Sequence, residues 1–146
     1  MKKKYKIGIG SDHAGYDLKS LINKYLREEG YTIKDAGPNS TESTDYPDYA
    51  HPLAKLVTNE MVDFGILICG SGNGIGMTAN KHNGVRAALC WNKEIAELAR
   101  KHNNANVLAL PARFINEKEG KDIVMAFIVT EFEGGRHQRR VDKINK

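Results

Sequence analysis

The feature that most constrains the fold is the continuous apolar run Phe64-Gly65-Ile66-Leu67-Ile68-Cys69. A strand with one buried face alternates apolar and polar residues, whereas an unbroken run of this kind is typical of a parallel strand covered on both faces. The run is far shorter than the roughly 20 residues that a membrane-spanning helix needs. We therefore expect a parallel sheet with this strand inside it, and no membrane segment.

Segments that favour strands and helices alternate along the chain. Strands are predicted at residues 5–9, 31–34, 64–69, 85–90 and 105–110, and helices at about 15–29, 49–60 and 75–81, then after the N-cap Asn92, and from Asn116 to about Phe132. A basic helix over residues 136–146 follows Gly134-Gly135. This alternation predicts an α/β fold: a single three-layer, Rossmann-like domain over residues 1–146, with a five-stranded parallel sheet and helices on both faces.

Composition excludes several classes of protein. A hydrophobic content of 40% and a charged content of 27% are typical of a soluble globular domain. Only Cys69 and Cys90 occur, so we expect reduced thiols in the cytoplasm rather than a disulfide framework. The basic start is not followed by an apolar segment long enough for a secretion signal.

The net charge of +4 is concentrated at the two ends of the chain. Lysines cluster before residue 7, arginines and lysines cluster after residue 135, and the part between them is net negative. A nucleic-acid-binding protein usually spreads basic residues over one face and interleaves aromatic residues. The layout therefore argues against nucleic acid as a partner and favours either a local anion site or plain solubility.

Polar side chains follow several of the predicted strands where each strand ends. Asp12 and His13 follow the first strand, Tyr46 the second, Cys69 ends the third, and Arg113 follows the fifth. In open parallel sheets, ligands bind beyond the carboxyl ends of the strands. We expect these side chains to meet at that edge.

A glycine-rich loop, Gly70-Ser71-Gly72-Asn73-Gly74-Ile75-Gly76, leads from the third strand into a helix. It is neither a dinucleotide-binding fingerprint nor a P-loop, because the third glycine and the Gly-Lys-Ser/Thr sequence of those motifs are missing. Its backbone N–H groups suit a phosphate or an oxyanion that forms during a reaction. The alternative is that the glycines only shape a turn.

Cys69 stands directly before this loop, whereas Cys90 has no such neighbour. A cysteine is most often a small buried apolar residue, and we assign Cys90 to the core. At Cys69 the following helix N-terminus favours a thiolate, which acts as a nucleophile or abstracts a proton.

None of the five histidines has the spacing of a metal site, so we predict no metal. His102 continues the expected inward face of its helix, where it is either catalytic or a hydrogen-bonded core residue. His51 and His82 are interpreted as solvated and receive no role.

Arg136 and Arg140 lie four residues apart and suit a phosphate dianion, although a solvated basic tail gives the same pattern.

Six ordered blocks of sequence resemble one known family. They are Gly10-Ser11-Asp12-His13-Ala14-Gly15, Thr44-Asp45-Tyr46-Pro47, residues 68–74, Ala79-Asn80-Lys81, residues 100–108 and Glu133-Gly134-Gly135-Arg136-His137-Gln138-Arg139-Arg140. Together they make the chain similar to the type B ribose-5-phosphate isomerases. The wider family includes galactose-6-phosphate and allose-6-phosphate isomerases.

The resemblance implies a metal-free and cofactor-free aldose–ketose isomerase that interconverts ribose 5-phosphate and ribulose 5-phosphate through an enediolate. Cys69 would move the proton between C1 and C2, His102 would help to open the furanose ring, and Ser71 would assist proton transfer between the oxygens. The implied substrate-binding residues are Asp12, His13, Tyr46, Gly70, Ser71, Gly72, Asn73, Gly74, Asn103, Arg113, Arg136 and Arg140. A homodimer or dimer of dimers with shared sites is also implied.

One branch of the family replaces the cysteine by a glutamate from the glycine loop. Here that loop position is Ile75 and the thiol is present, so the chain is similar to the cysteine branch. A hexose 6-phosphate, such as allose or galactose 6-phosphate, remains an alternative substrate. A non-catalytic module that binds a sugar phosphate or a nucleotide through the same loop remains an alternative function.

Overall fold

A computed structural model describes residues 3–144. The strands are β1 (Lys6–Ser11), β2 (Thr32–Asp35), β3 (Phe64–Cys69), β4 (Ala87–Leu89) and β5 (Val107–Pro111). The helices are α1 (Tyr16–Glu28), α2 (Pro47–Thr58), α3 (Asn73–Ala79), α4 (Lys93–Asn103), α5 (Glu117–Val129) and α6 (Arg136–Ile144). The predicted basic helix is thus confirmed as far as Ile144, and its last two residues, 145 and 146, lie outside the described part.

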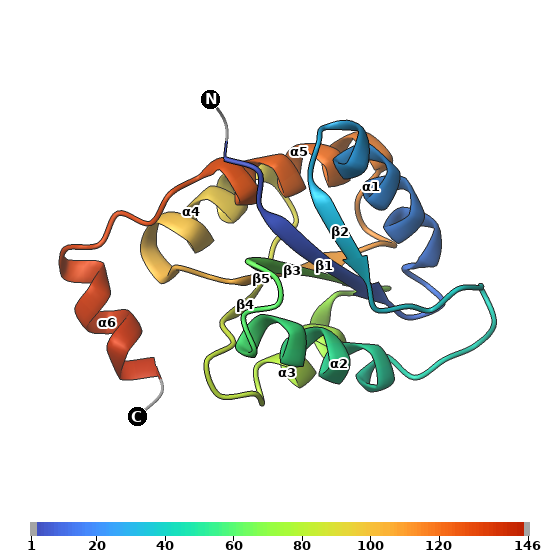
Figure 1. The fold of residues 1–146 in the computed structure, drawn as a ribbon, viewed down its shortest axis with the longest axis horizontal. Helices are drawn as coiled ribbons and strands as arrows, with labels where there is room; N and C mark the ends of the chain where they lie inside the picture. Colours follow the sequence, from blue (N-terminus) through green and yellow to red (C-terminus); the bar gives the residue numbers. More distant parts are fainter. Residues whose placement is uncertain (1–2, 145–146) are drawn as a thin grey trace.

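The five strands form one parallel sheet in the order β2-β1-β3-β5-β4, with β3 in the middle. Helices α1, α4 and α5 cover one face, and α2 and α3 cover the other (Figure 1). Alternate residues of β3 explain the unbroken apolar run. Ile66 and Ile68 join the core under the first layer of helices, whereas Leu67 and Cys69 join the core under the second. The predicted three-layer α/β fold is confirmed.

Several element boundaries differ from the prediction. The fourth strand is limited to Ala87–Leu89, and the residue before it, Arg86, donates its backbone N–H to the Asn106 side chain at 2.8 Å rather than to a strand. Helix α5 ends at Val129, because Thr130 has an extended backbone. The capping box of Asn116 with Glu119 is present as predicted.

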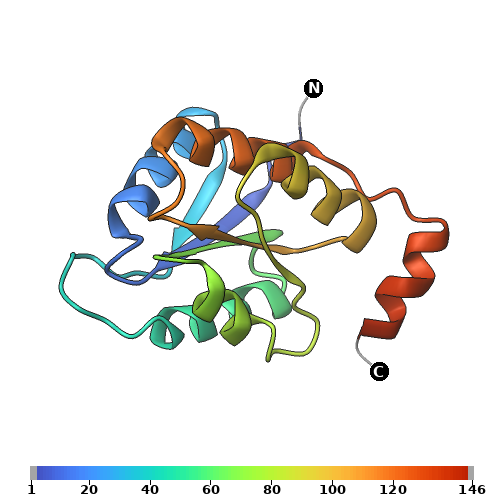
Figure 2. The same ribbon diagram turned by 180° about the vertical axis from the view of Figure 1, so that it is seen from behind.

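Helix α6 stands at the side of the molecule, next to α4 and away from the other helices (Figures 1 and 2). Gly134 and Gly135 both have positive φ, 69° and 58°, and turn the chain into this helix. Within residues 3–144, no helix is long and apolar enough to cross a membrane.

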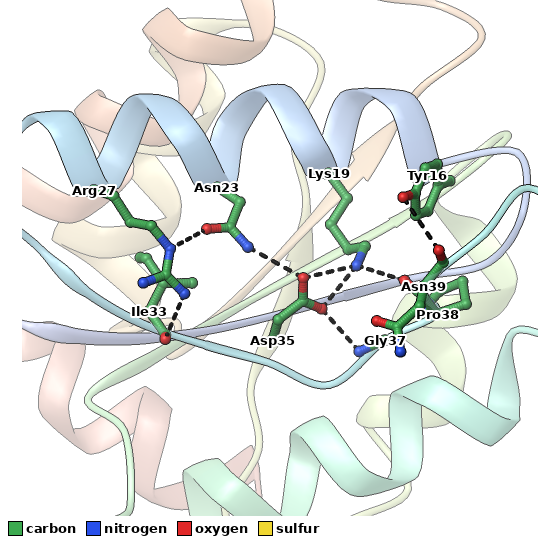
Figure 3. A network of polar contacts seen from close by, with 9 residues as sticks. All are labelled: Tyr16, Lys19, Asn23, Arg27, Ile33, Asp35, Gly37, Pro38 and Asn39. Atoms are coloured by element: carbon green, nitrogen blue, oxygen red, sulfur yellow. Dashed lines mark hydrogen bonds and ion pairs between the residues drawn. The ribbon is translucent and has the colours of Figure 1, made fainter.

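A network of polar contacts fixes the loop that follows β2 (Figure 3). The buried Lys19 ammonium on α1 donates to both carboxylate oxygens of Asp35, at 2.7 and 2.9 Å, and to the Pro38 carbonyl at 2.8 Å. The Gly37 N–H also donates to Asp35, at 2.8 Å. This loop continues to Tyr46, so the network holds one side of the sheet's carboxyl edge.

Candidate active site

A pocket of about 530 Å³ opens at the carboxyl edge of β1, β3 and β5. It is lined by Asp12, His13, Ala14, Tyr46, Cys69, Gly70, Ser71, Gly74, Arg113 and Phe114. Polar residues that are far apart in sequence therefore meet where the strand-end rule places a ligand. The prediction that these side chains meet at the carboxyl edge of the sheet is therefore correct.

Cys69 is buried and lines this pocket, and the glycine loop follows it directly in the chain. The N–H of Gly72 points to Sγ at 3.1 Å. Gly72 has a φ of +77°, and a Cβ there would collide with Leu89 and approach the Leu110 backbone. Only glycine fits this turn, and the turn places a backbone N–H donor against the thiol.

The other thiol is a core residue, as predicted. Cys90 is fully buried, and burial raises the pKa of its thiol to about 12. Such a group stays protonated at neutral pH and takes no part in the chemistry of the pocket.

Two further glycines let side chains lie directly against the loop. A Cβ on Gly70 would lie 3.2 Å from a guanidinium nitrogen of Arg113, and a Cβ on Gly74 would lie 2.5 Å from Cζ of Tyr46. The Ser71 hydroxyl is exposed and accepts the Asn73 N–H at 3.2 Å. Backbone donors, a cation, a phenol and a hydroxyl thus lie together along the glycine loop in this pocket.

Asp12 and His13 also line the pocket, and hydrogen bonds hold both in place. The buried Asp12 carboxylate accepts the Gly15 N–H at 3.0 Å at the start of α1. The backbone N–H of Thr44 donates to His13 Nδ1 at 3.1 Å, and the His13 N–H donates to the Thr44 hydroxyl at the same distance. With Nδ1 accepting, a neutral His13 carries its proton on Nε2 and offers a donor to a ligand.

Two residues of the predicted site, Gly72 and Asn73, line a smaller neighbouring cavity of about 140 Å³. They still belong to the same loop. Four others, His102, Asn103, Arg136 and Arg140, do not line the pocket of Cys69. Asn103 lines a separate cavity of about 350 Å³ together with Arg86 and Ile144.

The parallel topology explains this separation. Helix α4 leaves the carboxyl end of β4 and returns to the amino end of β5, so its last residues lie at the opposite edge of the sheet from Cys69. Helix α6 packs beside this end of α4 (Figure 1). Within one described chain, the predicted site is therefore divided between two edges of the sheet.

The prediction that His102 lies on the inward face of its helix is wrong. The buried residues of α4 are Ala96, Ala99 and Arg100, and the His102 side chain is 41% exposed. The inward polar residue is Arg100, which donates to the Ala105 carbonyl at 2.6 Å and lies over the Phe64 ring at 4.8 Å. The hydrophobic periodicity predicted the helix correctly, but the buried face of the helix is rotated by part of a turn from the predicted face.

His102 belongs to a cluster that sequence spacing did not reveal. Its ring stacks on that of His137, with centroids 4.2 Å apart and an interplanar angle of 11°. Glu133 Oε1 lies 3.5 Å from His137 Nε2 and 4.0 Å from His102 Nε2. One atom from each residue lies within 4.8 Å of the others, close enough for a metal in principle. The parallel rings direct their nitrogen lone pairs side by side rather than toward one point, which suits a shared carboxylate better than a metal.

A second histidine pair was also missed. His51 Nδ1 and His82 Nε2 lie 2.6 Å apart on α2 and in the turn after α3. Burial, then His51 and Lys55, lower the pKa of His82. This pair lies outside the Cys69 pocket and was predicted to be solvated only.

Comparison with known proteins gives consistent matches over nearly the whole chain. The family model described as Ribose/Galactose Isomerase matches residues 7–144. The probable ribose-5-phosphate isomerase B of Mycoplasma genitalium is 49% identical, over 96% of this chain and 93% of that protein. The D-erythrulose-4-phosphate isomerase of Pectobacterium atrosepticum is 45% identical, over 94% of this chain and 91% of its own length. The crystal structure of ribose-5-phosphate isomerase B from M. genitalium with bound ribulose 5-phosphate superposes with a TM-score of 0.91 at 48% identity, covering 96% of this chain and 93% of that one.

Proposed function

The chain belongs to the ribose/galactose isomerase family, and from that premise we propose that it is a ribose-5-phosphate isomerase that interconverts ribose 5-phosphate and ribulose 5-phosphate. The observation that carries the proposal is the Cys69 thiol, buried in a polar pocket with the Gly72 N–H 3.1 Å from its sulfur. A thiolate beside backbone donors has the two parts needed to move a proton next to a carbonyl.

In the proposed reaction, the Cys69 thiolate takes the proton from C2 of the open-chain aldose. The C2–H electrons form the C1–C2 double bond, and the carbonyl electrons move onto O1 to give an enediolate. Ser71 passes a proton from the C2 hydroxyl to O1, and the thiol returns its proton to C1. Only protons move, so the chemistry consumes no redox cofactor. Because the base is a reduced thiol, we also place the enzyme in the cytoplasm.

The negative charge that develops on oxygen sets the barrier to proton transfer. The glycine loop is proposed to lower this barrier by stabilising that charge. The backbone N–H groups between Gly70 and Gly74 are the proposed donors to the enediolate oxygens. Each well-aimed donor in such a site contributes roughly 3 kcal/mol to transition-state stabilisation. Asp12, His13 and Tyr46 are proposed to bind the sugar hydroxyls, and Arg113 to bind the phosphate.

A second copy of the chain completes this site in our proposal. His102 would open the furanose ring, Asn103 would bind a hydroxyl, and Arg136 and Arg140 would hold the phosphate, all of them from the partner. Two observations support a homodimer. The four residues lie away from the Cys69 pocket of their own chain, and α6 stands apart from the body, as an arm that reaches a neighbour would (Figure 2).

Exposed apolar side chains support docking of the partner on the carboxyl edge. Phe114 beside the pocket is 74% exposed, Met77 on α3 is 66% exposed, and Trp91 after β4 is 53% exposed. Trp91 and Phe114 follow the carboxyl ends of the neighbouring strands β4 and β5, and exposed apolar groups of this size are typical of an interface between subunits. Whether two such dimers pair further is tested by the mass of the protein in solution.

The length of the sugar is a separate question, for which a relative supplies an alternative. The Pectobacterium protein, at 45% identity, is named for a four-carbon substrate, so D-erythrulose 4-phosphate is the second candidate. The hexose 6-phosphates are the third. A pocket of about 530 Å³ accommodates any of these sugars, so volume alone does not choose between them.

The experiment that tests the proposal is turnover of EDTA-treated protein on ribose 5-phosphate, with D-erythrulose 4-phosphate and allose 6-phosphate as parallel substrates. We expect the highest kcat/KM on ribose 5-phosphate, no loss with EDTA, and exchange of the C2 proton with solvent. A higher kcat/KM on another sugar would reassign the substrate. Binding without turnover or exchange on any sugar would reduce the protein to a sugar-phosphate-binding module.

A further inference from the structure

The cluster of His102, Glu133 and His137, hereafter the Glu133 cluster, joins three segments of the chain. His102 lies in the last turn of α4, His137 in the first turn of α6, and Glu133 in the linker between α5 and α6. The Glu133 backbone is fixed as well, because its N–H donates to the Lys101 carbonyl at 3.1 Å. The carboxylate is thus held beside both rings.

We propose that Glu133 is a positioning residue of the isomerase, which holds His102 and His137 together and so orients both the ring-opening imidazole and the helix that carries Arg136 and Arg140. This inference rests on the proposed function, in which those residues serve the partner's pocket. Glu133 itself contacts no substrate in the proposal. It acts through the two histidines.

The attachment of α6 supports this role. The buried residues of α6 are His137 and Val141, and the other residues of the helix are exposed. The stacked rings therefore make up much of the contact between this helix and α4. The linker contains Gly134 and Gly135, both with positive φ. Because glycine is conformationally permissive, the linker restrains the direction of α6 only weakly. Without the carboxylate, the direction of α6 depends on the ring stack, on Val141 and on the linker backbone, where the Glu133 N–H donates to the Lys101 carbonyl.

The Glu133 carboxylate opposes the positive charges around the stacked rings. The groups that face His137 are His102 from α4, Arg136 and Arg140 from its own helix, and Glu133 from the linker. Burial of the ring, then His102 and Arg136, lower the pKa of His137, whereas Glu133 acts in the opposite direction. Glu133 is thus the one group of these four that offsets the positive charges. A glutamine of the same shape would remove that offset and keep the linker intact.

The test compares Glu133→Gln with Glu131→Gln, an exposed acid two residues earlier in the same linker. In Glu133→Gln we expect kcat/KM for ribose 5-phosphate to fall by roughly tenfold, with a weaker affinity for inorganic phosphate and a shifted pH–rate profile. The pKa of His137, followed by NMR of its ring nitrogens, should fall further. Glu133→Asp should restore part of each quantity, and Glu131→Gln should match wild type.

Three outcomes would overturn the proposal. The first is an unchanged His137 titration in Glu133→Gln, and the second is a changed titration with unchanged kinetics and phosphate affinity. The third is an equal loss in Glu131→Gln. Circular dichroism of each variant checks that it folds. If wild type turns over no sugar phosphate, the proposed function fails, whereas the titration and the phosphate affinity still decide whether Glu133 positions the histidines and the arginines.

Discussion

Replacement of Gly74 by alanine tests whether Tyr46 binds substrate from its place against the glycine loop. A Cβ at position 74 would lie 2.5 Å from Cζ, 2.6 Å from Cε1 and 2.8 Å from Oη of Tyr46. Carbon atoms in contact normally lie about 3.5–4.0 Å apart, so the ring must withdraw by roughly 1 Å. Tyr46 is 39% exposed and has room to move outward.

The expected cost falls on binding rather than on stability. A withdrawn phenol loses a hydrogen bond to the sugar, worth about 0.5–1.5 kcal/mol, so KM should rise roughly 2- to 10-fold. Alanine is a better helix residue than glycine by about 0.5–1 kcal/mol, so Tm should not fall. The Gly74 N–H is retained, and kcat should change less than KM.

The assay is steady-state kinetics on ribose 5-phosphate together with thermal unfolding. Gly76→Ala is the matched control in the same helix, because a Cβ there meets only the Ala109 methyl, at 3.3 Å. In a Tyr46→Ala background, Gly74→Ala should have no further effect on KM. An undiminished rise in KM in that background, or no rise in the single variant, would refute the reasoning.

Three further variants test the base, the phosphate contact and the loop network. Cys69→Ala should lower kcat by roughly 10²- to 10⁴-fold and leave the affinity for ribulose 5-phosphate nearly unchanged; a small effect in steady-state kinetics would remove Cys69 as the base. Arg140→Ala should mainly raise KM, because a lost guanidinium weakens phosphate binding in both ground and transition state; a loss confined to kcat would contradict this role. Lys19→Met should lower the free energy of unfolding by about 1–3 kcal/mol, because Asp35 loses its buried cation. Denaturant unfolding measures this loss, and Lys118→Met, in an exposed pair, should change stability little.

The fold was predictable because it depends on local patterns. The unbroken apolar run of β3 indicated a strand covered on both faces, and the N-cap Asn92 and the box of Asn116 with Glu119 marked the starts of two helices. These signals lie within a few residues of the elements that they define. Strand ends were less accurate, as in β4, because side chains from distant segments complete the hydrogen bonding there.

The candidate site was predictable only as far as the strand-end rule reaches. That rule brings Asp12, Cys69 and Arg113 into one pocket, because the carboxyl ends of parallel strands share an edge. It does not cover the ends of the helices. His102 was misplaced because a helix repeat of 3.6 residues leaves the centre of a buried face uncertain when Ala and Arg make up much of it, as Ala99 and Arg100 do.

The Glu133 cluster lay beyond any spacing rule. Its members are separated by 31 residues between His102 and Glu133, and their meeting depends on how α5 returns the chain to the end of α4. The same holds for His51 and His82, which come from different elements. Contacts of this kind follow from tertiary packing, which local sequence patterns do not encode.

In the proposed dimer, each site is shared between two copies, with Cys69 from one chain and His102 from the other. The most direct measurement mixes Cys69→Ala with His102→Asn in equal amounts, refolds them together and measures turnover of ribose 5-phosphate. Each variant alone should be nearly inactive. Half of the random dimers would be mixed, each with one intact site, so the mixture should regain about a quarter of wild-type activity. A mixture as inactive as its two components would contradict the shared site.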